Sequence, residues 1–493
     1  MLLKIIFVLG LTWTSTANSN ENGPLSITSP HGKIKLALKA GQEGLSYSVH
    51  FEGKKITGPN AIGLKTSTIG IGSKSKVKST KHRRVSRTLT VTIPTKNRLV
   101  KDEFNELRVA LTNGFDIILR AYDDGVAYRI QLPNAPDDIT IFDETVEFLF
   151  PRNHVAYFPR EKSMFTHFEQ YYEKTTVSDI TGMSLGILPM VVDAAPTKIL
   201  ITEAALRSYP GMFIKGGKPH GQLVGAFAPY PLREAVIEGP DKDQRNFKVI
   251  KGQSFIAKKK AKELLPWRVM VIAEKDTDLI STDLVYKLSP PLKLKQVDWI
   301  KPGLVAWDWW NANNIHGVNF KAGINNDTYK YYIDFAAQYD LEYVILDEGW
   351  SDTTNILKET PNIDVEALVK YGKSKGVKLI LWVLWNSLDQ KMEEALEQYA
   401  DWGVAGVKVD FMQRDDQKVV DFYWRTAAAA AKRKLLVNFH GSYKPTGIRR
   451  AYPNVLTREG VRGLEQNKWG TSQTVEQDLF LPFIRMAAGP LDY

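Results

Sequence analysis

The chain has 493 residues, which is too long for one ordinary domain and long enough to bury a large core. Hydrophobic residues make up 43% and charged residues 24% of the sequence, so disordered and collagen-like architectures are excluded. Cysteine is absent, which excludes a disulfide scaffold, thiolate metal sites, a catalytic thiol and a lipobox-type lipid anchor.

The net charge of +10 comes largely from one basic stretch at residues 74–87. Its cations are separated mainly by Ser and Thr and are Lys74, Lys76, Lys78, Lys81, Arg83, Arg84 and Arg87. Spaced cations of this kind are typical of a solvated edge strand. No nucleic-acid recognition motif accompanies them, so we expect no nucleic-acid partner.

The first predicted element is a secretory signal peptide over residues 1–17. Lys4 supplies the positive start, Ile5–Trp13 is a short apolar run, and Ser15 and Ala17 are small residues before a cleavage site. The apolar run is too short to span a bilayer, and no later stretch is long enough, so we expect no membrane anchor. A secreted chain without cysteine favours the bacterial periplasm.

Residues 18–294 are predicted to form a large antiparallel β-sandwich, because strand patterns are frequent and helical patterns are few. Polar and apolar residues alternate at Lys33–Leu38 and Leu89–Ile93, and less strictly at Phe247–Ile250. Phe115–Leu132 contains an Asp-Gly turn between two apolar runs, which predicts a hairpin.

Residues 295–493 show a different pattern, in which short apolar strands alternate with amphipathic helices. The expected strands are Gly303–Trp307, Tyr343–Leu346, Lys378–Leu384, Gly406–Phe411, Lys434–Phe439 and Asn454–Thr457, and the expected helices are Asp327–Tyr339, Asp364–Lys375, Lys391–Trp402 and Gln417–Lys432. Six such units predict a (β/α)8 TIM-type barrel with a parallel sheet. The 192 residues after Lys301 are fewer than the roughly 250 of a full barrel, so we expect an incomplete barrel, truncated before its end.

Carboxylate and indole side chains follow the predicted strand ends, where barrels hold their active sites. These rim residues are Asp308, Trp309, Asp347, Glu348, Trp350, Trp385, Asn386, Asp410, His440 and Glu459. Buried carboxylates are costly unless they are paired or bind a cation, so packing alone does not explain this set. Two separated carboxylates predict glycoside hydrolysis, in which one protonates the leaving oxygen and the other attacks carbon or activates water.

Asp410 is the best candidate for the nucleophile, because it ends an apolar strand and would project into the mouth of the barrel. The alternative is a strand-end aspartate that caps the next helix. The partner acid is expected among Glu459 and Glu465, although either could instead bind a metal or pair with Arg458 or Arg462. The spacing of these residues does not choose between the two glutamates.

Several motifs together resemble glycoside hydrolase family 97. They are Leu346–Trp350 (LDEGW), Gly406–Phe411 (GVKVDF), Thr457–Glu465 (TREGVRGLE), Pro482–Tyr493 (PFIRMAAGPLDY) and the upstream Ile201–Gly211 (ITEAALRSYPG). The resemblance implies an exo-acting α-glycosidase with a β-super-sandwich, a (β/α)8 barrel and a C-terminal β-domain. That last domain is expected to be missing here.

The family contains inverting α-glucosidases and retaining α-galactosidases. Inverting members carry a glutamate base where this chain has Gly441, and they lack the aspartate that stands here as Asp410. The resemblance therefore implies a retaining α-galactosidase that acts by double displacement on an oligosaccharide or glycoside. An inverting α-glucosidase of the same family and a non-catalytic periplasmic glycan-binding protein are the alternatives.

The resemblance also implies roles for individual residues. Asp410 would be the nucleophile and Glu465 the general acid/base. Substrate contacts are expected from Asp347, Trp350, Lys408 and His440, and Ca²⁺ ligands from Glu203, Glu459 and Glu465. Lys408 lies on the same strand face as Asp410 and is expected to keep it ionised. Glu203 would reach the catalytic site from the sandwich, and the chain is expected to act as a monomer.

Overall fold

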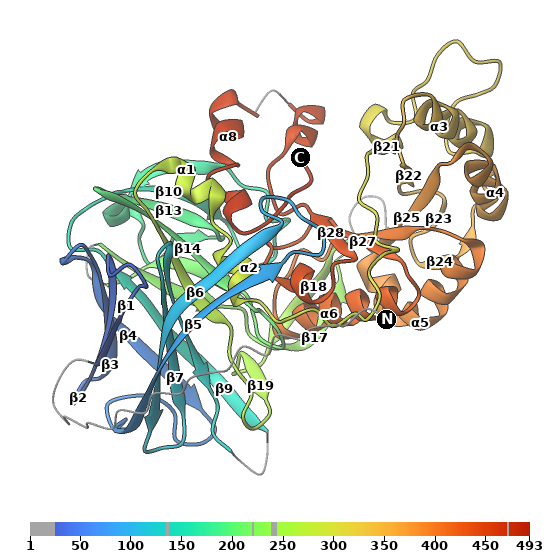
Figure 1. The fold of residues 1–493 in the computed structure, drawn as a ribbon. Helices are drawn as coiled ribbons and strands as arrows, with labels where there is room; N and C mark the ends of the chain where they lie inside the picture. The colour runs from blue at the N-terminus through green and yellow to red at the C-terminus, as the bar shows by residue number, and fades with distance from the viewer. Residues whose placement is uncertain (1–24, 135–137, 219–220, 238–243, 471–472) are drawn as a thin grey trace, which may run out of the picture.

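The computed structural model describes residues 25–134, 138–218, 221–237, 244–470 and 473–493, so the predicted signal peptide lies outside the described residues. An antiparallel β-sandwich extends to residue 273, and a parallel α/β unit begins at residue 305 (Figure 1). The short helices α1 (Asp276–Ser281) and α2 (Leu284–Leu288) follow the sandwich, and an irregular segment leads from them to the parallel unit.

The sandwich consists of two layers of antiparallel strands. The first layer contains β1 (Leu25–Thr28), β2 (Ile34–Gly41), β3 (Gly44–Phe51), β4 (Lys54–Thr66), β9 (Ile139–Leu149), β19 (Ala257–Lys259), β16 (Gln222–Phe227), β15 (Met212–Gly216) and β12 (Leu185–Gly186). The second contains β5 (Val77–Thr90), β6 (Leu99–Leu111), β7 (Asp116–Tyr122), β8 (Gly125–Gln131), β20 (Trp267–Ala273), β14 (Thr197–Ala204), β13 (Met190–Ala194), β10 (Val155–Glu161) and β11 (Tyr172–Thr176). Because β10 also pairs with β12, the layers are hydrogen-bonded to each other along one side.

The sandwich strands follow the alternation of the sequence. Every second residue of β3 is buried, as expected of a strand with one face on the core. The predicted hairpin at Phe115–Leu132 is confirmed as β7 and β8, and Phe247–Ile250 lies in β18 (Phe247–Gly252), which pairs with β17 (Pro231–Val236). The strand predicted at Leu89–Ile93 is largely wrong, because β5 ends at Thr90 before Pro94, which has no N–H to donate to a ladder.

The parallel sheet has six strands in chain order among the described residues. They are β21 (Val305–Trp307), β22 (Tyr343–Leu346), β25 (Lys378–Leu384), β26 (Gly406–Asp410), β27 (Leu436–Phe439) and β28 (Val455–Arg458). Each connection between neighbours is a crossover, which parallel pairing requires. In the described part of the chain, β21 and β28 are the two edges of this sheet, and the incomplete (β/α)8 barrel stays a prediction.

Helices alternate with or follow the strands of the parallel sheet, and short elements lie in the loops of both units. The helices are α3 (Asn326–Gln338), α4 (Val365–Lys375), α5 (Trp385–Trp402), α6 (Gln417–Lys432), α7 (Ile448–Ala451) and α8 (Val475–Phe480), and the short elements are β23 (Ser351–Asp352), β24 (Asn355–Glu359) and the 3₁₀ turns η1 (Val177–Asp179), η2 (Asp308–Asn311), η3 (Leu464–Lys468) and η4 (Arg485–Ala487). Among the residues that the structure describes, no helix has the length and apolar character needed to cross a bilayer.

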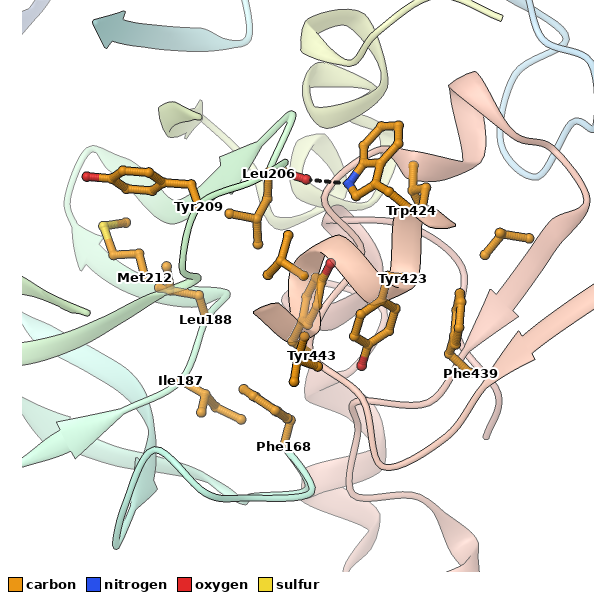
Figure 2. Packing of buried hydrophobic residues seen from close by; sticks show 14 of the residues in the cluster. Phe168, Ile187, Leu188, Leu206, Tyr209, Met212, Tyr423, Trp424, Phe439 and Tyr443 are labelled. Atoms are coloured by element: carbon orange, nitrogen blue, oxygen red, sulfur yellow. Dashed lines mark hydrogen bonds between the residues drawn. The ribbon is translucent and has the colours of Figure 1, made fainter. Parts of the chain in front are cut away.

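Apolar side chains from both units pack together at the domain interface (Figure 2). Phe168 of the sandwich contacts Tyr443 of the parallel unit, with ring centroids 6.4 Å apart. The Trp424 indole N–H of α6 donates to the carbonyl of Leu206 over 2.8 Å. These buried contacts hold the carboxyl ends of the parallel strands against one edge of the sandwich.

A buried ion-pair network crosses the same interface. Arg268 on β20 donates to Glu144 over 2.9 Å and to Glu203 over 2.8 Å, and all three side chains are buried. Glu203 also pairs with Lys444, which follows β27 in the parallel unit. Glu203 therefore connects the two units by accepting charge-assisted hydrogen bonds from both of them.

We expect the substitution Arg268→Met to lower the free energy of unfolding by about 3–5 kcal/mol, because two buried carboxylates lose their shared cation. The measurement is chemical denaturation of the full chain. Arg160→Met is the control, since Arg160 pairs with Glu173 at the surface and such pairs contribute about 0–1 kcal/mol. Equal losses in the two variants would contradict a structural role for the buried network.

Candidate active site

Asp410 ends β26, and the parallel register places side chains from neighbouring strands beside it. Lys408 lies two residues earlier on the same strand face, and its Nζ is 3.6 Å from Asp410 Oδ2. The same Nζ donates to Asp347 Oδ2 over 2.7 Å, just after β22. Asp416, and not Asp410, accepts hydrogen bonds from the first turn of α6, so the helix-cap interpretation of Asp410 is wrong.

Asp410 is buried, with 8% of its surface exposed, and it is held as an anion. Burial alone would raise its pKa, but the charges of Lys408 and His440 and hydrogen bonds from Trp382 and the Phe411 amide hold it below the ordinary aspartate value. Trp382 Nε1 donates to Oδ2 over 3.1 Å, and the Phe411 amide donates to Oδ1 over 2.6 Å. A carboxylate that stays ionised and fixed in direction is suited to act as a nucleophile.

Asp308 orients the neighbouring Asp347 from the end of β21. Its carboxylate accepts from Tyr329 over 2.7 Å and from the Asp347 amide over 3.1 Å. Burial and the nearby charge of Asp347 raise the pKa of Asp308 to about 6. Asp347 also accepts from the Trp307 indole over 2.5 Å, so its carboxylate is fixed by Lys408 and Trp307 together.

A cavity of about 1050 Å³ runs along the parallel sheet next to these residues. Trp307, Lys408, His440, Glu459 and Glu465 are among the side chains that line it. Asp410 itself does not line the cavity, but Lys408 and His440, whose charges act on Asp410, do. The hollow is large enough for a sugar and has both carboxylates and indoles in its wall.

Glu465 belongs to the 3₁₀ turn η3 and lines the same cavity. Its Oε1 accepts a hydrogen bond of 2.6 Å from the Trp309 indole, which leaves Oε2 available to carry a proton. Trp309 follows β21 at the other edge of the sheet, so the first and sixth parallel strands together hold this carboxyl group.

A loop of the sandwich between β10 and β11 reaches the same place and was missed by the sequence analysis. It carries His167 and Glu169, and its Thr166 amide donates to the carbonyl of Gln413 over 2.9 Å. Gln466, the residue after Glu465, donates to Glu169 over 2.6 Å. The only local signal is a histidine and a glutamate two residues apart in an aromatic segment, which does not by itself indicate a site.

Glu169, Glu459 and Glu465 form a group of acids with mutual repulsion. Burial, and then the charges of Glu465 and Asp410, raise the pKa of Glu169 to about 8. Burial, and then Glu169 and Asp410, raise the pKa of Glu459 well above its ordinary value. The Gly441 amide donates to Glu459 over 2.7 Å. In the described part of the chain, imidazoles lie beside two of these acids, with His440 Nδ1 3.5 Å from Glu459 Oε1 and His167 Nδ1 3.8 Å from Glu169 Oε1.

Two residues assigned from the sequence have other roles. Glu203 is neutralised by Arg268 and Lys444 and does not join Glu459 and Glu465, so it is not suited to bind Ca²⁺. Trp350 is 0% exposed, donates to the Trp382 carbonyl over 2.7 Å and packs against helix α5, so it is a core residue and not a sugar contact.

His440 lies where the sequence analysis expected it, on the wall of the cavity. It is buried, and its Nε2 is 3.0 Å from Asp492 Oδ2, while its Nδ1 is 3.5 Å from Glu459 Oε1. Its ring meets the Trp307 ring edge to face at 5.8 Å. The candidate site therefore brings Lys408, His440, Glu459 and Glu465 around one hollow, and Lys408 connects it to Asp347.

The family model described as Glycosyl-hydrolase 97 N-terminal matches residues 27–291, and the model described as Glycoside hydrolase 97 matches residues 309–461. The chain is also 36% identical to a retaining alpha-galactosidase of Bacteroides thetaiotaomicron, over 99% of this chain and 75% of that protein. The chain belongs to glycoside hydrolase family 97. It is therefore a glycoside hydrolase, and its resemblance to the α-galactosidase branch is confirmed.

Two further family 97 comparisons agree with this assignment. A probable retaining alpha-galactosidase of Streptomyces bingchenggensis is 27% identical, over 100% of this chain and 73% of that protein. A family 97 enzyme of Pseudoalteromonas sp. strain K8, solved in complex with acarbose, superposes with a TM-score of 0.83 at 26% identity, over 95% of this chain and 74% of that one. The family 97 architecture thus extends across both units of the chain.

We expect Lys408→Met to move the acidic limb of the pH–rate profile to higher pH by about one pH unit or more. Lys408 lowers the pKa of Asp410, so without it Asp410 would take up a proton earlier as the pH falls. The measurement is kcat/KM against pH. Lys259→Met is the control, because Lys259 is a buried lysine of the sandwich paired with Glu263, and its loss should leave the profile in place.

Proposed function

We propose that this family 97 enzyme is an exo-acting retaining α-galactosidase that hydrolyses terminal α-galactosides by double displacement. The observation that carries the proposal is Asp410, a buried carboxylate at the end of β26 whose pKa is held low by Lys408 and His440. The relative from Bacteroides thetaiotaomicron, named a retaining alpha-galactosidase, supports the same activity.

In the first step, an Asp410 oxygen attacks the anomeric carbon while the bond from that carbon to the leaving oxygen breaks. Glu465 gives its proton to the leaving oxygen, so the aglycone departs as an alcohol and a galactosyl ester remains on Asp410. In the second step, Glu465 takes a proton from water, and the water oxygen displaces Asp410 from the anomeric carbon. Two inversions at that carbon give a product with the α configuration of the substrate.

The backbone at Gly441 argues against the inverting alternative. Its φ is +51°, in the left-handed region where side chains are strained, and an added Cβ would lie 3.1 Å from the Phe411 amide nitrogen. The same Cβ would be 3.3 Å from Asp410 Oδ1. A glutamate base at this position would therefore crowd the proposed nucleophile, which favours the retaining reaction over an inverting α-glucosidase.

We also propose that Ca²⁺ binds to Glu169, Glu459 and Glu465. Among the described residues, no three acidic or histidine side chains already converge as metal ligands do. The donor chemistry nevertheless fits, because these are hard carboxylate oxygens, and burial and the neighbouring acids raise the pKa values of Glu169 and Glu459. When bound, Ca²⁺ supplies the charge that allows neighbouring carboxylates to ionise together.

Glu465 would then be both a Ca²⁺ ligand and the general acid/base, with a different carboxyl oxygen for each role. Trp309 donates to Oε1 over 2.6 Å and fixes the direction of the carboxyl group. One oxygen can face the cation while the other exchanges the proton of the reaction.

We further propose that the enzyme acts in the bacterial periplasm, on the basis of the signal-peptide pattern at residues 1–17 and the absence of cysteine.

We expect turnover of 4-nitrophenyl α-galactoside, with the α anomer of galactose as the first product. The measurement is a parallel assay with the α-galactoside and the α-glucoside, with the product anomer followed by proton NMR. An initial β anomer would contradict the retaining reaction, and preference for the glucoside would contradict the substrate assignment. No turnover of either compound by the full chain would support a glycan-binding role instead.

We expect Glu169→Gln to weaken Ca²⁺ binding by at least about tenfold, because one anionic ligand is lost. Glu203→Gln is the matched control and should lower stability while Ca²⁺ affinity stays the same, since Glu203 pairs with Arg268 and Lys444. Calorimetric titration of the EDTA-treated proteins with Ca²⁺ measures the Ca²⁺ affinity of both variants. Readdition of Ca²⁺ should restore the activity of the EDTA-treated enzyme. A greater loss of Ca²⁺ affinity in Glu203→Gln than in Glu169→Gln would contradict the proposed ligand set.

A further inference from the structure

A second pocket, of about 250 Å³, lies on the outer face of the second sandwich layer, and β5, β6, β7 and β8 contribute residues to its lining. It is distinct from the catalytic cavity, and the residues that line the two are different. Its described lining contains five cations, Lys81, Arg83, Arg108, Arg120 and Arg129, and one acid, Glu106.

The cations of this pocket are close neighbours across the strands. Lys81 on β5 stands directly opposite Arg108 on β6. Arg108 is opposite Ile118 on β7, and Ile118 is opposite Arg129 on β8, so three cations occupy one row of the sheet. Like charges in directly opposite positions destabilise a sheet. This arrangement costs stability unless an anion compensates it.

The acids near the pocket are already used by other cations. Glu106 pairs with Arg83 and with Arg120, each over 2.7 Å. Arg108 pairs with Asp116 over 2.5 Å. These pairs give Arg83, Arg108 and Arg120 a carboxylate partner each and leave no carboxylate in the described lining for Arg129.

Arg83 Nε and Arg129 Nε are both buried in this pocket without a hydrogen-bond partner among the described residues, and of the two side chains Arg129 has no carboxylate partner in the described lining. The Arg129 guanidinium lies 4.2 Å from the centre of the Trp267 ring. Burial, and then the charge of Arg120, lower the pKa of Arg129 to about 9. The Arg129 guanidinium is held between the Trp267 ring and the neighbouring cations, so its N–H groups are oriented before any ligand binds.

Protection of a sheet edge does not explain this group. β5 is an edge strand, and its exposed cations fit that role. Arg129 is on β8, which pairs with β7 on one side and β20 on the other, so it lies within the sheet. An interior arginine surrounded by cations has no use in blocking edge-to-edge association.

We propose that this pocket binds an oxyanion group carried by a glycan, either a sulfate ester or a uronate carboxylate, with Arg129 as the central contact. The planar guanidinium fork matches both groups, and Lys81, Arg83 and Arg108 surround them with positive charge. The pocket thus serves as a non-catalytic glycan site on the sandwich, away from the active site, and is independent of the galactosidase assignment.

The test uses the full chain with sodium sulfate and with galacturonate as probes, at constant ionic strength, and with neutral galactose as the uncharged reference. Calorimetric titration should show saturable binding of at least one of the two anions. Arg129→Met keeps the apolar stem over Trp267 and should weaken that binding about tenfold or more, since it removes charge-assisted hydrogen bonds. Glycosidase activity should stay unchanged, because the variant is remote from the catalytic residues.

Arg84→Met is the matched control. Arg84 is on β5 next to Arg83 and faces the other side of the sheet, so it removes the same charge without entering the pocket. Lys81→Met changes an exposed position on the pocket face and should also weaken anion binding. It is the alternative test variant if Arg129→Met does not fold. Absence of saturable binding, or equal weakening by Arg84→Met, would overturn the proposal. The anion that binds identifies the glycan class.

Discussion

A buried carboxylate needs a cation, a proton or several hydrogen-bond donors nearby, because burial in a protein interior disfavours its charge. The domain interface and the active site both follow from how this need is met. At the interface, Arg268 and Lys444 neutralise Glu203 and connect the sandwich to the parallel unit. In the active site, Lys408 keeps Asp410 ionised. Around Glu459, burial and the neighbouring acids raise the pKa values of Glu169 and Glu459, and this difference motivates the proposed Ca²⁺ site.

The two units depend on each other for the site. The parallel sheet orients Asp347, Lys408 and Asp410 through rigid strand ends, which is the usual way in which such sheets present catalytic groups. The sandwich adds a loop with His167 and Glu169, which the packing at Phe168 holds against the parallel unit (Figure 2). Separation of the units would therefore remove both the interface core and part of the acid group.

Local sequence patterns predicted the parallel strands and their rim well, because period and strand length are local properties. β22 and β25 begin and end where expected, and Asp410 is the last residue of β26. The role of Glu169 could not be predicted this way, since it depends on a loop of one domain docking onto another. Glu203 and Trp350 were misassigned because a motif does not show which way a side chain points or which cation lies opposite it.

The central claim is that Asp410 is the ionised nucleophile, and chemical rescue tests it most directly. Asp410→Ala should abolish hydrolysis of 4-nitrophenyl α-galactoside, and added azide should restore turnover by taking the place of the missing carboxylate. The rescued product should be β-galactosyl azide, since a single displacement inverts the anomeric carbon. Full activity of the variant without azide, or complete lack of rescue in a folded variant, would contradict the account.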